Sequence, residues 1–148
     1  MKTPFLIGRL IFGGYFLYSG IHHFTERKVM IEATKSKKVP MPDLAVDLTG
    51  AAMVAGGASI LLGVKPKLGT AAIAGFLAGV SPIMHNFWQS ADPEQRMNDM
   101  INFTKNMALL GGAVALMGVE EPWPVSASVA QPTRMQRLLK FGRNKIAA

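Results

Sequence analysis

The sequence predicts an all-α integral membrane protein, a four-helix bundle followed by a basic C-terminal tail. Hydrophobic residues make up 49% of the 148 residues, whereas charged residues make up only 17%, below the roughly 25% of an average globular protein. The apolar residues form long runs, and a membrane-spanning helix needs about 20 mainly apolar residues. The charges lie in the gaps between these runs, so the net charge of +7 does not indicate a nucleic-acid-binding surface.

Four segments are expected to span the membrane. A soluble bundle would need polar faces at the helical period, and the second and third segments have none. The first segment carries Arg9 as its only full charge and lacks the small-residue cleavage site of a secretory signal. The apolar half of the fourth, residues 107–119, is too short by itself and requires a helix that begins near Arg96. The expected spans are residues 4–24, 44–64, 68–88 and 96–119.

The loop between the first two spans, residues 25–42, mixes five Lys or Arg residues with apolar Val29, Met30 and Ala33. This pattern is compatible with a short interfacial helix. Four spans place both termini on one side of the membrane, and that side carries more basic residues. The positive-inside rule therefore favours cytoplasmic termini, in a bacterial inner or cytoplasmic membrane.

The chain is expected to divide into a bundle, residues 1–119, and a tail, residues 120–148. The first part of the tail is rich in turn residues, and Trp123 suits the headgroup level. The second part places Met135, Leu138 and Leu139 on one helical face, as in a helix on an anionic membrane surface; a disordered basic tail is the alternative. The residues expected to bind anionic lipid headgroups are Arg134, Arg137, Lys140 and Arg143.

Small residues are frequent in the spans, including a GxxxG pattern at Gly75 and Gly79 and the residues Gly56, Gly57 and Ser59 in the second span. Small residues allow membrane helices to approach closely. We interpret them as contacts within the bundle rather than as a dimer motif.

Polar residues within the spans gather at one end of the expected bundle, because the ends of spans one and three lie beside the starts of spans two and four. Asn98, Asn102 and Lys105 share one face of span four. An ionised Lys in the hydrocarbon costs at least about 2.5 kcal/mol, so Lys105 is expected to face the bundle and to have a partner, with Asp47 and Asp99 as the candidates. Lys105 is therefore predicted to lie within ion-pair or hydrogen-bond reach of Asp47, Asp99, Asn102 or His85. The candidate polar pocket comprises Tyr18, His22, Asp47, His85, Asp99, Asn102, Lys105 and Asn106.

A structural interpretation of the same residues stays open, in which the histidines lie at the headgroup level and Lys105 forms a structural ion pair. No metal site is predicted. The sequence contains no Cys, which excludes disulfides, thiolate metal sites and Fe–S clusters. No His pair has ligand spacing on one helix, and the adjacent His22 and His23 project about 100° apart.

Several segments together resemble the DoxX family of small four-helix membrane proteins. They are an early Arg in span one, SGIHHF at its end, the KSKKVPMP loop, a Gly/Ala-rich second span ending in LLGV, HNFW closing span three and FTKNMALLGG opening span four. The resemblance runs from about Arg9 to Gly118 and leaves out the tail. It implies a redox-linked membrane role, since the family includes the quinone-linked membrane subunit of thiosulfate dehydrogenase and members associated with membrane oxidoreductase complexes and redox defence.

Two functions follow as hypotheses, and whether the chain catalyses a reaction stays open. The first is an accessory or structural subunit of a larger membrane redox complex, without a cofactor of its own. The alternative is a quinone-binding subunit of an oxidoreductase such as a thiosulfate–quinone type enzyme, in which Lys105, His85 or Tyr18 would hydrogen-bond the quinone carbonyls. An enclosed apolar cavity reaching His85 and Lys105 would favour quinone binding, and a salt-bridged core would favour the accessory role.

Overall fold

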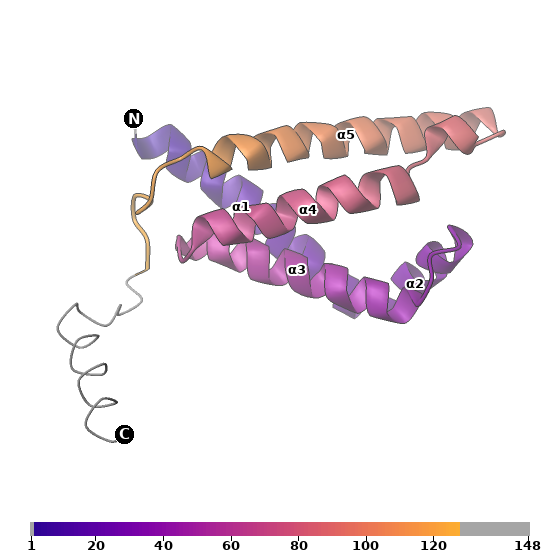
Figure 1. The fold of residues 1–148 in the computed structure, drawn as a ribbon, viewed down its shortest axis with the longest axis horizontal. Helices are drawn as coiled ribbons and strands as arrows, with labels where there is room; N and C mark the ends of the chain where they lie inside the picture. Colours follow the sequence, from indigo (N-terminus) through magenta and orange to yellow (C-terminus); the bar gives the residue numbers. More distant parts are fainter. Residues whose placement is uncertain (1, 128–148) are drawn as a thin grey trace, which may run out of the picture.

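The computed structural model describes residues 2–127, which form five α-helices and one 3₁₀ turn (Figure 1). Four of the helices are long and apolar enough to cross a membrane, so the predicted all-α, four-span membrane bundle is confirmed. The basic residues Arg134, Arg137, Lys140 and Arg143 lie outside the described residues. The elements are α1 (Lys2–Thr25), α2 (Arg27–Ser36), α3 (Pro42–Leu62), α4 (Pro66–Met84), η1 (Phe87–Gln89) and α5 (Pro93–Met117).

Prolines mark the starts of three helices, because a proline at the first helical position has the right φ and no N–H to leave unpaired. Helix α5 begins at Pro93, three residues before the expected start, since the Asp92 carboxylate accepts a hydrogen bond from the Gln95 amide at 2.9 Å and caps it. Helix α4 ends at Met84 rather than at Trp88. Its last turn contains Pro82, which cannot donate to the preceding turn.

The loop helix α2 confirms the short helix suggested by residues 25–42. It packs on α3 and also contacts α1, close to the end at which α1 finishes and α3 begins (Figure 1). Its inward side is marked by the buried residues Ile31 and Thr34. The helix therefore closes one end of the bundle.

Helix α3 is central, packing against α1 on one side and α4 on the other, while α5 packs mainly on α4. Helix α1 runs diagonally behind the other helices, with its N-terminal end near the C-terminal end of α5 (Figure 1). The ring of Phe12 reaches α5 there, since a Cβ on Gly112 would lie 3.3 Å from it. Helix α5 is consequently the least covered span: 11% of its apolar window is buried, against 22% to 33% in the other three.

Glycines set the contact between α1 and α3. A Cβ on Gly57 would lie 2.5 Å from the Leu17 nitrogen, and a Cβ on Gly20 would lie 2.7 Å from the Val54 nitrogen. The two backbones thus approach so closely that no larger residue fits without displacement, which is how small residues act in membrane helix pairs.

The GxxxG pair does not have the predicted role. A Cβ on Gly75 or Gly79 would meet no atom within 4 Å, and both residues are exposed, so the expectation that they pack within the bundle is wrong. Helix α4 packs through Gly69, Ile73 and Leu77 instead. Gly75 follows Ile73 by two residues, which at 100° per residue places it on nearly the opposite face.

The segment after α5 folds back onto the bundle. Trp123 is 2% exposed and joins the core with Phe16, Met53 and Ile60. Its ring meets Phe5 edge-on at a centroid distance of 5.3 Å. The Trp123 ring therefore packs against protein rather than against lipid headgroups, because the irregular segment 120–127 continues the apolar core.

Arg9 holds this segment in place, a role that the sequence did not reveal. Its guanidinium donates to the carbonyl oxygens of Pro124 at 2.7 Å and of Leu61 and Val125 at 2.9 Å each. Arg9 is 4% exposed, and its buried Nε has no partner within the described chain. The Glu121 carboxylate accepts from the Lys67 amide at 3.1 Å, where a negative charge suits the N-terminus of α4.

We expect Gly57→Ala to reduce the free energy of unfolding by about 1–3 kcal/mol, the usual cost of overpacking a filled contact. Gly8→Ala is the matched control, because a Cβ on Gly8 meets no atom within 4 Å. Unfolding by sodium dodecyl sulfate in mild detergent, followed by circular dichroism, measures both. Equal stability of the two variants would contradict the close approach of α1 and α3.

Arg9→Lys should release the segment 120–127, because one ammonium group cannot reach three carbonyls that a planar guanidinium bridges. In a Trp88→Phe background Trp123 is the remaining Trp of the two in the chain, and its fluorescence emission should shift to longer wavelength. Arg96→Lys, at an exposed position, is the control and should leave the emission unchanged. Unchanged emission in Arg9→Lys would show that Arg9 does not hold the segment.

Candidate functional site

The polar residues predicted to share one pocket fall into separate groups in the structure. One group surrounds Asp99 where α2, α4 and α5 meet, and a second joins Arg27 to the start of α3. A third runs along α5 through Asn98, Asn102 and Lys105. Tyr18 and His22 form a further pair on α1.

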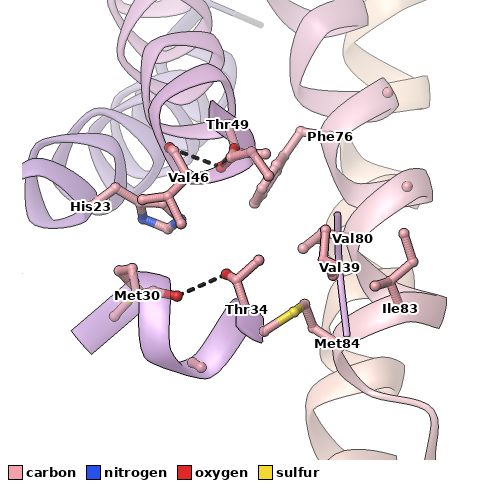
Figure 2. Close-up of a pocket in the computed structure, with 14 residues that line it drawn as sticks. His23, Met30, Thr34, Val39, Val46, Thr49, Phe76, Val80, Ile83 and Met84 are labelled. Carbon is pink, nitrogen blue, oxygen red and sulfur yellow. Dashed lines mark hydrogen bonds between the residues drawn. The ribbon is translucent and has the colours of Figure 1, made fainter. Parts of the chain in front are cut away.

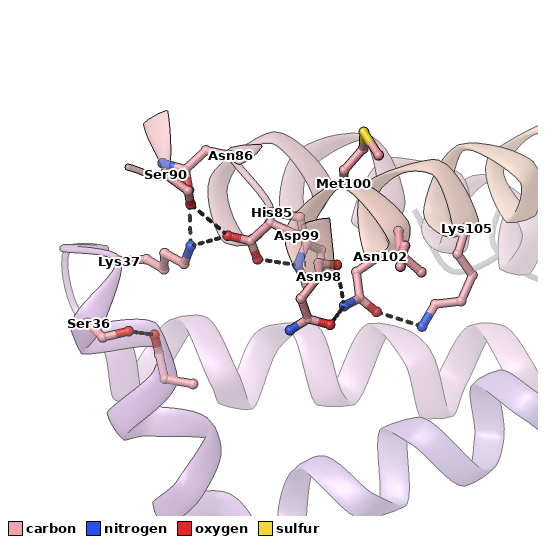
Figure 3. A network of polar contacts seen from close by, with 12 residues as sticks. Ser36, Lys37, His85, Asn86, Ser90, Asn98, Asp99, Met100, Asn102 and Lys105 are labelled. Atoms are coloured by element: carbon pink, nitrogen blue, oxygen red, sulfur yellow. Dashed lines mark hydrogen bonds and ion pairs between the residues drawn. The ribbon is translucent and has the colours of Figure 1, made fainter. Parts of the chain in front are cut away.

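Asp99 is the centre of the first group, which we call the Asp99 network (Figure 3). Its side chain is 5% exposed, and its oxygens lie 3.2 Å from Lys37 Nζ, 3.4 Å from His85 Nδ1 and 3.3 Å from Ser90 Oγ. Lys37 Nζ also donates to the Asn86 side-chain oxygen at 3.0 Å. The network therefore ties the C-terminal end of α2 to the end of α4 and the first turns of α5.

Arg27 pairs with Asp47 in a two-pronged contact, with Nε 2.7 Å from Oδ1 and Nη2 2.8 Å from Oδ2. Asp43 adds a longer contact at 3.5 Å. The hydrogen bond to Asp47, aided by the charges of both carboxylates, raises the pKa of Arg27 above its usual value. This pair fastens the start of α2 to α3.

Lys105 lies within hydrogen-bond reach of Asn102, as predicted, but it does not form the ion pair expected with Asp47 or Asp99. Arg27 at the start of α2 and Lys37 just after its end pair with these two acids instead. The planar guanidinium of Arg27 matches the Asp47 carboxylate, and the fold places Lys37 beside Asp99. Lys105 Nζ instead donates to the Asn102 side-chain oxygen at 2.9 Å. Within residues 2–127 Lys105 has no salt bridge, and its side chain is exposed.

Asn102 continues this polar row, because its amide nitrogen lies 3.0 Å from the Asn98 backbone oxygen and 3.2 Å from the Asn98 side-chain oxygen. Asn98, Asn102 and Lys105 form what we call the α5 stripe (Figure 3). Asn106 is half-buried beside it, and within the described residues its side chain makes no hydrogen bond. The stripe follows one face of α5, as the spacing predicts.

Tyr18 and His22 lie on the exposed side of α1, where their rings stack with centroids 6.0 Å apart and planes 13° apart. Tyr18 is 68% exposed. The next residue, His23, turns toward the bundle, and its Nδ1 lies 3.0 Å from the Ser19 carbonyl oxygen. These positions do not bring Tyr18 or His22 into the Asp99 network.

A mostly apolar cavity of about 270 Å³ lies between α2, α3 and α4, near the end of α1 (Figure 2). The predicted quinone-contacting residues Tyr18, His85 and Lys105 do not line this cavity. One histidine that was not predicted as a site residue, His23, does line it. The sequence features that could have located it are the exposed pair Gly75 and Gly79 and the apolar side of the loop helix. Its lining residues are His23, Met30, Ala33, Thr34, Val39, Ala45, Val46, Thr49, Gly75, Phe76, Gly79, Val80, Ile83 and Met84.

The Asp99 network is suited to holding elements together. Its carboxylate, ammonium and imidazole groups are buried or half-buried, and they contact one another, so little of their hydrogen-bonding capacity remains for a ligand. Within residues 2–127 no three His, Cys, Asp or Glu side chains gather in a way that could hold a metal ion.

We expect Asp99→Asn to lower the free energy of unfolding by about 3–5 kcal/mol, because it leaves the half-buried Lys37 ammonium without its carboxylate. Lys37→Met alone should also destabilise the protein. The double variant should lose less than the sum of the two single variants, since it removes both charges.

Glu32→Gln is the control for these variants, because it breaks the exposed pair with Lys35 and should cost less than about 1 kcal/mol. Detergent unfolding followed by circular dichroism gives all four values. Additive losses in the double variant would show that Lys37 and Asp99 are not coupled.

Comparison with known proteins identifies one family. The family model DoxX matches residues 5–86, which is more than half of the 148 residues and covers α1 to α4 after the first residues. The match ends before α5, so the FTKNMALLGG segment lies outside it. No curated protein and no solved structure matches the chain.

Proposed function

This chain belongs to the DoxX family, and we propose that it is an accessory subunit that associates with a membrane redox complex through α5. The observation that carries the proposal is the exposed Lys105 within a candidate membrane span. A charged residue inside a membrane span is expected to have a partner. We infer that another membrane subunit supplies it.

The position of Lys105 makes an unpartnered charge costly. Lys105 lies twelve residues from each end of α5, about 18 Å from either end at 1.5 Å per residue. A Lys at the centre of a spanning helix costs about 2.5–3.5 kcal/mol on insertion scales. The Asn102 oxygen at 2.9 Å solvates the ammonium but does not neutralise it.

The rest of α5 is suited to docking. It is the least covered of the four spans, and it exposes Met97, Met100, Ile101 and Val114. Apolar side chains beside a polar stripe allow close packing together with specific polar contacts between membrane helices. We expect the partner to place a carboxylate opposite Lys105, and hydrogen-bond donors or acceptors opposite the side-chain amide of Asn98.

Quinone binding at Tyr18, His85 and Lys105 is the alternative, and it has less support. The three side chains lie in separate groups, His85 contacts Asp99, and the apolar cavity reaches none of them. A quinone bound at the join between this chain and its partner stays compatible with the docking proposal.

Lys105→Met tests the proposal, because it removes the charge and keeps most of the volume. We expect recovery of the native complex from mild detergent, measured by blue native electrophoresis and mass spectrometry, to fall at least about tenfold, since removing one member of a buried charge pair is costly. Lys28→Met, which removes an exposed charge outside the spans, should leave recovery unchanged.

Quinone-linked electron transfer in the same membranes separates the two functions. Loss of the complex in Lys105→Met supports docking. A retained complex with reduced turnover favours the quinone alternative, and unchanged assembly and turnover would contradict both roles for Lys105. A photo-reactive residue at exposed position 101 of α5 should cross-link the redox subunit, whereas the same residue at position 11 of α1, also exposed, should not.

A further inference from the structure

The apolar cavity between α2, α3 and α4 is lined by no residue of the α5 stripe, and we call it the α2–α4 groove (Figure 2). We propose that it binds one acyl chain of an anionic phospholipid, with the lipid phosphate at the basic C-terminal end of α2. This inference does not depend on the proposed docking function.

The depth of the groove matches one leaflet of a bilayer. Its lining residues on α4 run from Gly75 to Met84, a rise of about 14 Å along a helix. The hydrocarbon core is about 30 Å thick, so the groove extends through about half of it. The end of the groove beside Met84 is formed by α2 (Figure 2). Because α2 lies outside the spans, we place this end of the groove at the membrane surface.

The walls present carbon atoms to an occupant. Two side chains in them carry hydroxyl groups, and both hydroxyls are used internally: Thr34 donates to the Met30 carbonyl and Thr49 to the Ala45 carbonyl, each at 2.7 Å. The remaining walls are apolar apart from His23. Such a lining favours a hydrocarbon chain over a polar ligand.

The size of the groove favours a slender occupant. The groove has a volume of about 270 Å³. Pockets that bind drug-sized ligands usually have about 300–1,000 Å³, so the groove is small for such a ligand. A helix of a second protein, about 10–12 Å across with its side chains, would need a much larger volume than this over the same length. The exposed Gly75 and Gly79 provide the space, since no atom lies within 4 Å of a Cβ at either position.

The basic residues at the α2 end of the groove favour an anionic headgroup. Residues 25–42 carry five basic and two acidic side chains. Arg27, Lys35 and Lys37 have acidic partners, whereas Lys38 has no salt bridge within residues 2–127. Lys38 is exposed and precedes Val39, which lines the groove, so its ammonium is available to a phosphate at this end.

His23 adds a polar group at the same end. A carbonyl oxygen only accepts hydrogen bonds, so the contact with Ser19 requires the proton on Nδ1 and leaves Nε2 as an acceptor in the neutral ring. Figure 2 shows this ring turned toward the space between α2 and α4. An Nε2 acceptor suits a hydroxyl of a headgroup such as glycerol.

Native mass spectrometry of the full chain in mild detergent tests the proposal. The protein is incubated with palmitoyl-oleoyl phosphatidylglycerol or with phosphatidylcholine bearing the same chains. We expect one phosphatidylglycerol to be retained per chain, in clear preference to phosphatidylcholine. Lys38→Gln should reduce that preference about fivefold, the usual contribution of one basic residue near an anionic lipid surface.

Gly79→Leu fills the groove and should reduce retention of phosphatidylglycerol at least about tenfold. The Leu side chain displaces methylene groups of the acyl chain from the groove, and each displaced methylene weakens the binding of the lipid. Gly75→Leu, one turn deeper, is a second variant of the same kind. Gly8→Leu is the matched control, because its Cβ also meets open space but lies outside the groove. Circular dichroism of each variant verifies that the helices are retained.

Four results would overturn the proposal. They are equal retention of both lipids, retention in Gly79→Leu and Gly75→Leu at the level of Gly8→Leu, an unchanged lipid preference in Lys38→Gln, and displacement of the lipid by an equal concentration of ubiquinone. The last result would assign the groove to an isoprenoid tail instead.

Discussion

The close approach of the α1 and α3 backbones is the contact on which the arrangement of this bundle depends. Lipid tails are as apolar as Leu or Ile side chains, so helices in a membrane gain little from burying apolar surface and associate through tight packing. Gly20 and Gly57 allow that packing, and Gly56 repeats it on the side of α3 that faces α4. Helix α3 thereby packs on both α1 and α4, whereas α5 contacts the bundle mainly through α4 and keeps an exposed face.

The ionised groups show how the ends of the bundle are closed. Helix α2 brings Arg27 to Asp47 at its start and Lys37 to Asp99 just after its end, so a short helix outside the spans satisfies both acids. At the opposite end Arg9 donates to three carbonyl oxygens and fixes the segment that carries Trp123. Lys105 differs from these groups, because it is exposed and its side-chain partner within the described chain is the neutral Asn102 amide on the same helix.

Two outward features therefore remain, and they have no residue in common. The α5 stripe offers a charge and amides to another protein, and the α2–α4 groove offers hydrocarbon walls beneath a basic helix. Both proposals, a partner subunit at the stripe and a lipid in the groove, are compatible with membership of the DoxX family. Neither feature requires the chain itself to carry a redox group.

Long apolar runs determined the class, the four spans and the loop helix, because the length of a spanning helix and the place of charges are properties of the sequence alone. The same reasoning placed Asn98, Asn102 and Lys105 on one face of a helix. Only the tertiary structure decided which acid meets which cation: Lys37 and Asp99 are 62 residues apart, and helical period carries no information across that distance. It also decided that Trp123 is buried and that Gly75 and Gly79 face outward, since the rotation of each helix depends on what its neighbours pack against.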